Sequence, residues 1–277
     1  YKMDYLVVRK AEATTRIFIG EIGLLIIEST AVSLTTMLLS ELTKHKIKVI
    51  FCDEKHNLQS ELISYYGSHD TSAKIRTQIQ WTREVKENVW TEIVAEKVKQ
   101  QSEHLKKYEL KVPADMLKRY IEEIELGDKT NREGHAAKVY FNSLFGKSFT
   151  REDQCDINYA LNYGYTILLS QFNKEIVSQG YLTQLGIKHH NVYNSFNLSS
   201  DLMEPFRPLV DKIVKENFNE RFDGGMKVKL VDVLNHKVRI KGKDQYVSNA
   251  ISIYVKSVFN AIDKKDVDLI NFFEYEL

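Results

Sequence analysis

The sequence predicts an α+β protein in which a small N-terminal β-sandwich with one helix precedes a larger all-α domain. Two observations support this fold class. Short runs of β-branched and apolar residues recur in residues 1–66, a pattern typical of strands. Residues 72–105 contain neither glycine nor proline and repeat apolar residues every four positions, which predicts a helix. We therefore expect a β-rich domain at 1–66, a linker at 67–72 and a helical domain at 73–277.

In the N-terminal part, the apolar runs predict strands, and a single apolar stripe predicts the helix between them. Ser33 or Thr35 would cap that helix, and Asp70 or Ser72 would cap the first helix after the linker. Further helical patterns and a glycine-turn hairpin complete the chain. The strands are expected at 5–8, 16–19, 23–27 and 47–51, the later helices at 113–125, 131–145, 153–180, 201–218 and 248–263, and the hairpin at 238–247.

Composition narrows the class of protein. The chain has 277 residues, 43% of them hydrophobic, with 39 basic against 38 acidic residues, so any affinity for DNA must come from local patches. Two cysteines, Cys52 and Cys155, form no disulfide framework and indicate a reducing cytoplasm. We find no apolar stretch of the ~18 residues that a membrane span needs and no secretory signal. Because Tyr1 replaces an initiator methionine, we expect a preceding N-terminal segment.

The segment Leu185–Pro208 carries the strongest chemical signal. It gathers His189, Asp201 and Glu204 in one short polar stretch, and imidazole with carboxylates can bind a divalent cation. The spacing of Asp201 and Glu204 also fits a capping box, with Asp201 as the N-cap of a helix and Glu204 three residues later. Both interpretations remain open on spacing alone.

Several short sequence motifs favour one family. DLMEPFRP at 201–208, preceded by Gly186 and a Lys188-His189 pair, resembles the C-terminal signature of the CRISPR-associated integrase that inserts new spacers into CRISPR arrays. NREGH at 131–135, AKVYFN at 137–142 and LFG at 144–146 agree, and LTTML at 34–38 with VIFCD at 49–53 resembles its subtype II-A form. The resemblance covers nearly the whole chain in the same order.

The resemblance implies a metal site made of Glu133, His189 and Glu204, with Asp201 supporting it by orienting His189 or capping a helix. The ion would be Mg²⁺ or Mn²⁺. The reaction would be attack of a DNA 3′-hydroxyl on a repeat phosphodiester, with spacer-precursor DNA and leader–repeat DNA as substrates. The family works as a homodimer formed through the N-terminal β domains, and two dimers flank a dimer of a small ferredoxin-like adaptation partner.

Two groups of basic residues are candidates for DNA contacts, although a solvated charged face would look the same. The first group lies on the expected long helix and the second around the hairpin. They comprise Lys74, Arg76 and Arg83, and then Lys237, Arg239 and Lys241. Two other functions remain open: a stand-alone metal nuclease for branched DNA, with water as nucleophile, and a non-enzymatic helical scaffold in which the acidic residues are caps and surface charges.

Overall fold

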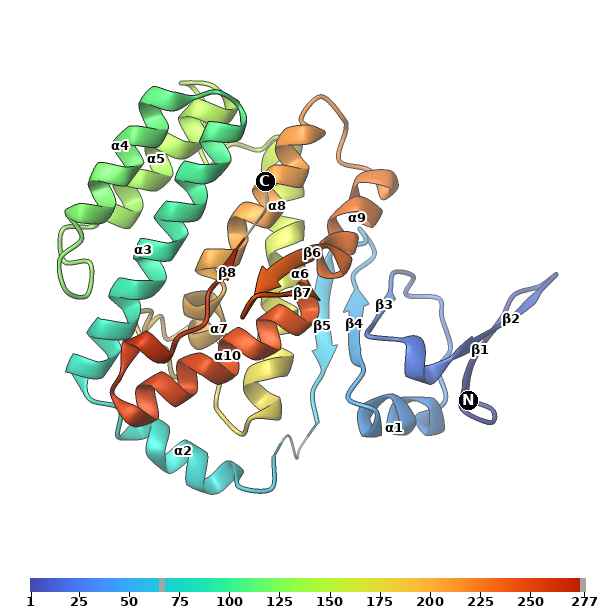
Figure 1. Ribbon diagram of the computed structural model, residues 1–277. Helices are drawn as coiled ribbons and strands as arrows, with labels where there is room; N and C mark the ends of the chain where they lie inside the picture. The colour runs from blue at the N-terminus through green and yellow to red at the C-terminus, as the bar shows by residue number, and fades with distance from the viewer. Residues whose placement is uncertain (65–67, 275–277) are drawn as a thin grey trace. The chain divides into compact units, whose positions relative to one another are not determined.

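The computed structural model describes residues 1–64 and 68–274, which belong to two compact units, Tyr1–Tyr66 and Gly67–Leu277. Figure 1 traces the chain through both. The expected linker begins at residue 67, and that residue lies outside the described ones. Each unit has its own elements, and the predicted α+β class is confirmed because small sheets in the first unit are followed by a mostly helical second unit.

The N-terminal unit contains two small sheets and one helix around a shared core. One sheet is the antiparallel pair β1–β2, and the other has the order β3–β4–β5, with β3 parallel to β4 and β5 antiparallel to it. Thr35 caps the helix by accepting from the N–H of Leu38 at 3.3 Å. The elements are β1 (Tyr5–Arg9), β2 (Thr14–Phe18), η1 (Ile19–Glu21), β3 (Leu24–Ile27), α1 (Thr36–Lys44), β4 (Lys48–Cys52) and β5 (Leu58–Leu62).

A shared hydrophobic core stabilises the short strands of the N-terminal unit. Alternating side chains of β1 and β4 and the apolar stripe of α1 face the same interior. Burial of each such side chain stabilises the folded state by about 1.5–3 kcal/mol. The buried members are Leu6, Ile19, Leu38, Leu42, Ile47 and Val49.

The C-terminal unit is built around the long helix α3, and Figure 1 shows α4 and α5 running alongside it. α3 also packs against η2, α8 and α10, while α6 packs against α8, α9 and α10. Its helices are α2 (Thr71–Ile79), α3 (Arg83–Lys107), α4 (Lys111–Glu122), α5 (Arg132–Phe145), α6 (Asp156–Ser178), α7 (Asn197–Leu202), η2 (Glu204–Phe206), α8 (Arg207–Glu216), α9 (Gly224–Val231), η3 (Asp232–Asn235), α10 (Val247–Lys264) and η4 (Val267–Leu269).

The hairpin expected near the C-terminus is present as β6 (Lys237–Ile240) and β7 (Lys243–Tyr246), which pair in antiparallel register. Its turn passes through Lys241 and Gly242, both at positive φ, and glycine adopts such a conformation without strain. A third strand, β8 (Phe273–Glu274), pairs with β6. No helix of residues 1–64 or 68–274 has the length and apolar character of a membrane span.

Two helix boundaries differ from the sequence prediction. The helix expected from 72 to 105 is broken into α2 and α3 between Gln80 and Thr82, where Thr82 caps α3 by accepting from the N–H of Val85. Trp81 in that break is buried against Tyr181, with ring centroids 5.6 Å apart. No glycine or proline marks the break, so the local sequence signals did not reveal it.

The second difference concerns the helix expected at 201–218. Asp201 is not its N-cap but lies in the last turn of the preceding helix α7. The chain then passes through η2 into α8, which begins at Arg207. The capping-box interpretation is therefore wrong.

Candidate active site

Glu133 lies in the first turn of α5, and the residues before that helix fix its backbone. Asp128 accepts hydrogen bonds from the N–H groups of Arg132 and Glu133, at 2.7 and 3.2 Å. Asn131 caps the helix by accepting from the N–H of Gly134 at 3.3 Å. These bonds satisfy donors that the start of a helix leaves without partners. The position from which the Glu133 side chain extends is therefore well defined.

Glu204 begins η2, and the residue two positions later anchors that turn in the core. The ring of Phe206 is fully buried. Its centroid lies 5.3, 5.4 and 4.4 Å from those of Phe172, Tyr254 and Phe273. Aromatic contacts at these separations are favourable beyond the area that they bury. They hold η2 against the helices, which leaves only 4% of the Glu204 side chain exposed.

A buried lysine joins the two glutamates. Lys97 Nζ, on α3, lies 2.6 Å from Glu133 Oε1 and 2.5 Å from Glu204 Oε2. Arg207 Nε approaches the other oxygen of Glu204, at 2.9 Å. Two carboxylates from separate helices thus share one cation position, which we call the carboxylate centre: Lys97, Glu133, Glu204 and Arg207.

The charges in the carboxylate centre maintain one another. Burial opposes the ionisation of Glu204, but the positive charges of Arg207 and Lys97 outweigh it and hold the pKa of that carboxyl below its usual value. Burial likewise opposes the charge on Lys97, and Glu204 and Glu133 raise its pKa nonetheless. Buried charges persist only when paired in this way. The centre therefore favours the ionised form of the Glu204 carboxylate.

Asp201 has a different task from Glu204, although only two residues separate them. Its Oδ2 accepts from the N–H groups of Ile187 and Lys188 at 2.6 and 2.9 Å, and its Oδ1 from the N–H of His189 at 3.1 Å. Gly186 is required beside it, because a Cβ there would lie 2.8 Å from Asp201 Oδ2. Asp201 therefore holds the loop that carries His189.

His189 is oriented by the same carboxylate. Its Nδ1 lies 2.5 Å from Asp201 Oδ1. Nδ1 donates to this carboxylate oxygen, and in the neutral ring Nε2 then keeps its lone pair. The hydrogen bond to Asp201, with the charges of Glu204 and Glu133, raises the pKa of His189. The ring also meets the edge of Trp90, with centroids 5.8 Å apart.

A cavity of about 220 Å³ opens beside the carboxylate centre. Besides the four residues of the centre, it is lined by Gln101, Phe141, Arg151, Tyr165 and Asp211. His189 does not line it, and its ring is turned to Asp201. Within residues 1–64 and 68–274, no group of three His, Cys, Asp or Glu side chains has the proximity of a metal site.

The donor atoms nevertheless fit a hard divalent ion. Glu133 and Glu204 already converge on a cation, the ammonium of Lys97, and carboxylate oxygens with one imidazole are ligands that suit Mg²⁺ or Mn²⁺. The structure thus brings Glu133 and Glu204 together. It places His189 on a loop where the hydrogen bond to Asp201, with the charges of these two glutamates, raises the pKa of its ring.

Sequence reasoning did not assign Lys97 or Arg207 to the site. Lys97 had a usable signal, because it follows Ile93 by four residues on the apolar side of α3, where Val94 and Val98 are also buried. A lysine on a buried helical face must find counter-charges. Which carboxylates supply them depends on distant helices and could not be read from spacing.

The basic candidates on α2 and α3 differ in their surroundings. Lys74 is partly covered, with Nζ 3.8 Å from Asp263 and 5.4 Å from the centroid of the Tyr181 ring. Arg76 is exposed. Arg83 is 83% exposed and pairs with Glu87 at 2.7 Å. Arg76 and Arg83 are therefore accessible to a partner, whereas Lys74 is engaged within the protein.

The basic candidates on the hairpin all face solvent. Lys237 and Arg239 alternate along β6 with the buried Val238 and Ile240, and Lys241 lies in the turn. The period of two places both strand residues on the outer face.

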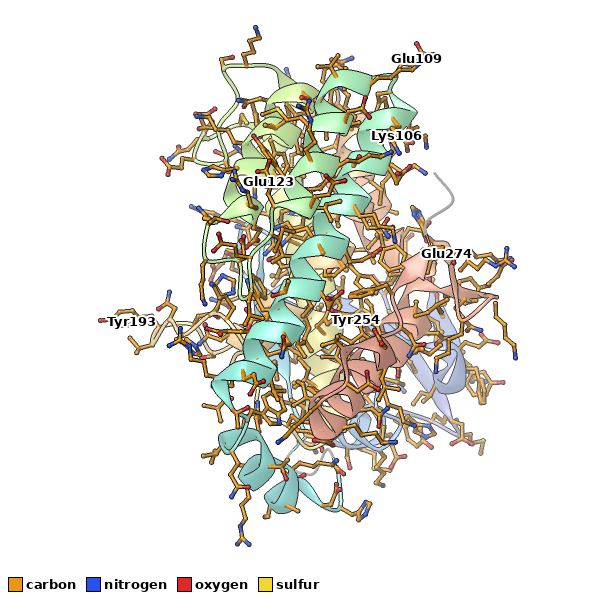
Figure 2. All side chains as sticks on the ribbon, turned by 60° about the vertical axis from the view of Figure 1, so that its left-hand side comes forward. Lys106, Glu109, Glu123, Tyr193, Tyr254 and Glu274 are labelled. Carbon is orange, nitrogen blue, oxygen red and sulfur yellow. The ribbon has the colours of Figure 1, made fainter. Side chains whose placement is uncertain are left out.

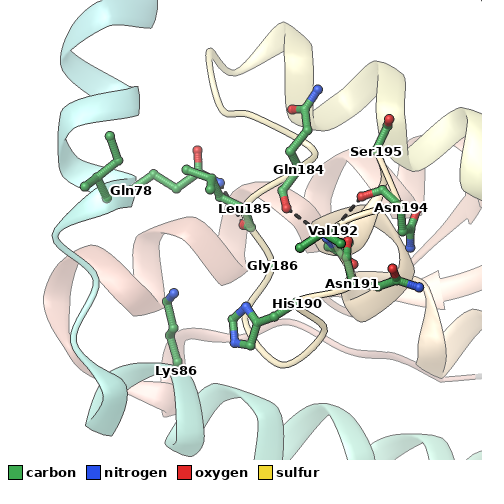
Figure 3. A pocket seen from close by; sticks show the side chains of 12 residues that line it. Gln78, Lys86, Gln184, Leu185, Gly186, His190, Asn191, Val192, Asn194 and Ser195 are labelled. Atoms are coloured by element: carbon green, nitrogen blue, oxygen red, sulfur yellow. Dashed lines mark hydrogen bonds between the residues drawn. The ribbon is translucent and has the colours of Figure 1, made fainter.

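Two pockets flank the loop that carries His189. One, of about 400 Å³, lies between α2 and the loop, and Figure 3 shows Gln78 reaching the loop. The other, of about 510 Å³, contains a run of basic side chains. Lys86 and His190 line both pockets. The basic lining of the second comprises Arg83, Lys86, Lys129, Lys188 and His190, which we call the basic pocket.

The loop that carries His189 also contains two exposed residues with large side chains. Val192 is 88% and Tyr193 93% exposed, and Figure 2 shows Tyr193 standing away from the ribbon. An exposed aromatic side chain can stack on a nucleic-acid base.

Comparison with known proteins identifies the class. Residues 1–223 match the family model described as CRISPR associated protein Cas1. The chain is 30% identical over 251 residues to the CRISPR-associated endonuclease Cas1 of Neisseria meningitidis serogroup C (strain 8013), which covers 89% of this chain and 83% of that protein. It is 26% identical over 281 residues to the CRISPR-associated endonuclease Cas1 1 of Francisella tularensis subsp. novicida (strain U112), covering 91% and 86%.

Solved structures share the fold. A casposase bound to integration product matches with a TM-score of 0.73 at 20% identity, over 92% of this chain and 84% of that one. A chain of a Cas6-RT-Cas1--Cas2 complex matches with a TM-score of 0.72 at 21% identity. That match covers 96% of this chain but 34% of the other, so this chain spans about a third of that longer protein.

The chain is thus a CRISPR-associated endonuclease by family. It belongs to the Cas1 family, because the family model matches most of its length and a curated Cas1 enzyme reaches 30% identity over nine-tenths of it. The sequence-based prediction of a CRISPR-associated endonuclease is confirmed.

Proposed function

We propose that this protein inserts new spacer DNA into a CRISPR array, with Glu133, His189 and Glu204 holding a divalent ion. The observation that supports this assignment is the convergence of Glu133 and Glu204 on one cation position. Asp201 orients His189 from behind, an arrangement typical of histidine ligands. A Mg²⁺ or Mn²⁺ ion bound there supplies positive charge for a phosphoryl oxygen and lowers the pKa of a bound hydroxyl.

The reaction needs no energy source beyond the phosphodiester itself. The 3′-oxygen of the incoming DNA forms a bond to phosphorus of the repeat strand, and the bond from that phosphorus to the displaced 3′-oxygen breaks. The attacking hydroxyl loses its proton and the leaving oxygen gains one, so the number of phosphodiesters is conserved. Arg207 adds positive charge beside the reacting phosphate, which favours the anionic transition state.

The basic pocket and its neighbourhood offer a path for the DNA. Arg83, Lys86 and Lys188 line it, and Arg76 with the hairpin residues Lys237, Arg239 and Lys241 supplies further exposed charge. If these residues contact phosphates, log affinity should fall by about 0.9 per contact with log salt. Replacing Arg83 by alanine should flatten that slope with little dependence on DNA sequence. A salt-independent affinity would mean that these charges are only solvated.

The assembly follows the same assignment. We propose a homodimer formed through residues 1–66, two copies of which flank a dimer of a small ferredoxin-like adaptation partner, and a cytoplasmic location for the complex. The relatedness to a Cas6-RT-Cas1--Cas2 complex supports a partner of this kind. We further propose the subtype II-A form, because glutamate rather than aspartate stands at position 204 and the II-A words recur at 34–38 and 49–53.

The decisive experiment supplies both substrates. A labelled linear duplex is incubated with a repeat-bearing plasmid, the protein, its adaptation partner and Mn²⁺. Joined product at the leader–repeat border identifies an integrase. Cleavage without joining would instead indicate a stand-alone nuclease that uses water. A thermal stability that does not change with Mn²⁺ would favour a scaffold, since a ligand bound only by the folded state must raise stability.

A further inference from the structure

Lys97 lies between the carboxylates of Glu133 and Glu204 and contacts both. Only 8% of its side chain is exposed. Its ammonium contacts Glu133 at 2.6 Å and Glu204 at 2.5 Å. Because ligand oxygens surround a divalent ion at roughly 2.0–2.6 Å, the ammonium lies where an ion shared by these two glutamates would have to bind.

The charges of the centre already balance without an ion. Glu133 and Glu204 contribute two negative charges, and Lys97 with Arg207 contributes two positive ones. A divalent ion added to this set would leave a net excess of two positive charges in a mostly buried site. Uncompensated buried charge is unfavourable, so ion entry must be coupled to movement of a cation away from the two carboxylates.

The same cavity contains acceptors that could receive a displaced ammonium. Gln101 follows Lys97 by four residues on α3 and therefore lies on the same helical face. Its Oε1 is buried and has no hydrogen-bond partner in the described part of the chain. The same holds for Asp211 Oδ2, and both residues line the cavity beside Lys97. Buried acceptors without a partner are uncommon in folded proteins, and these two are placed to accept from the Lys97 ammonium.

We propose that Lys97 is a tethered counter-ion that occupies the cation position until a divalent ion enters, whereupon its ammonium moves toward Gln101 and Asp211. Lys97 is thus a positioning residue: it holds Glu133 and Glu204 close together before the metal arrives, and it weakens metal binding by competing for them. The inference rests on the proposed function, because it assumes that these two glutamates bind the metal.

Mn²⁺ affinity without DNA tests this competition separately from catalysis. Calorimetric titration of Mn²⁺ into the full chain at fixed pH should show at least about tenfold tighter binding for Lys97→Met than for the wild type. Lys97→Gln, which keeps a hydrogen-bond donor, should behave alike and serves if the methionine variant does not fold. Lys97→Arg keeps the charge and should bind Mn²⁺ no more tightly than the wild type. Lys99→Met is the matched control, since it removes an exposed lysine from the same helix.

The receiving acceptor can be tested in the same assay. Gln101→Leu should weaken Mn²⁺ binding several-fold in the wild type, because the displaced ammonium loses its partner. In the Lys97→Met background the same change should have no effect, since no ammonium needs a place. A double-mutant cycle of this form isolates the coupling between the two side chains.

The outcomes are distinguishable. Equal Mn²⁺ affinity in the wild type, Lys97→Met and Lys97→Gln, with loss of binding in Glu204→Gln, would overturn the role of Lys97 and leave the proposed metal site intact. Absence of Mn²⁺ binding in all variants would overturn both. Tighter binding in the neutral Lys97 variants alone, with Lys99→Met unchanged, would establish the competition.

Discussion

Two buried polar clusters lie close together in the helical unit and differ in how they accommodate titratable groups away from water. The carboxylate centre keeps its charges because each faces an opposite charge within 3 Å. The second cluster consists of His104, Tyr140, Tyr165 and Asp211, where His104 Nδ1 lies 2.5 Å from the Tyr140 hydroxyl and Tyr165 hydrogen-bonds to Asp211.

The second cluster has no ion pair of its own. Burial, with the charges of Lys107, Lys212 and Lys215, lowers the pKa of His104 to about 3. Burial raises the pKa of Asp211 to about 6, against the hydrogen bonds from Tyr165 and Tyr140.

The comparison shows that the partner, more than the depth of burial, decides whether a group stays charged. Paired carboxylates remain available as ligands for an ion. Unpaired titratable groups shift toward their neutral forms.

The largest expected effect is on catalysis at the paired cluster. Glu204→Gln replaces the anionic ligand that we propose by a neutral one, so integration should fall by more than a thousandfold, or roughly 4 kcal/mol of transition-state stabilisation. Glu103→Gln, which changes a side chain on α3 that is 45% exposed, is the control and should retain activity. The plasmid integration assay measures both. Near-normal joining by Glu204→Gln would place the chemistry elsewhere.

The second cluster should respond to an acid-to-amide substitution in the opposite way, with a gain in stability instead of a loss of activity. The pKa of Asp211 is raised on folding, so its contribution to stability is present below about pH 4 and is lost as pH rises through about 6. Asp211→Asn removes this loss and keeps an acceptor for Tyr165. Between pH 4 and pH 7 the variant should gain about 3 kcal/mol relative to the wild type. Urea unfolding at both pH values measures this; parallel stability curves would show that Asp211 is paired after all.

Asp201 sharpens the comparison as a third buried carboxylate, bonded to backbone N–H groups and His189. Asp201→Asn places an amide NH₂ against donors of the loop at 187–189, so stability should fall as well as activity. Activity should decrease 10- to 100-fold, at most about 2.7 kcal/mol. The integration assay with a parallel unfolding curve checks this. A loss as large as that of Glu204→Gln would make Asp201 a ligand rather than a support.

The smallest of the four effects concerns His104. Its pKa is depressed on folding, so stability is present above the unfolded value of about 6.5 and is lost as pH falls toward about 3. His104→Gln cannot take up the proton. On lowering the pH from 7 to 5, the wild type should lose about 2 kcal/mol more than the variant. Chemical unfolding at the two pH values compares them, and identical losses would mean that His104 accepts a proton within the fold.

The sequence predicted part of this picture for physical reasons. Strand runs, helix stripes and the hairpin are local patterns, and the predicted class matched. The break before Thr82 was missed because neither glycine nor proline marks it. The role expected for Asp201 as an N-cap was wrong because the spacing of Asp201 and Glu204 does not reveal that another helix, α7, already precedes them. The role of Lys97 depends on contacts between distant helices, which no local pattern encodes.

Anomalous diffraction from a Mn²⁺-soaked crystal of the full chain tests the central claim most directly. The account predicts one strong manganese peak roughly 2.0–2.3 Å from carboxylate oxygens of Glu133 and Glu204 and from Nε2 of His189, with Lys97 Nζ withdrawn from between them. A saturated crystal in which manganese binds elsewhere, while Lys97 still bridges Glu133 and Glu204, would contradict it.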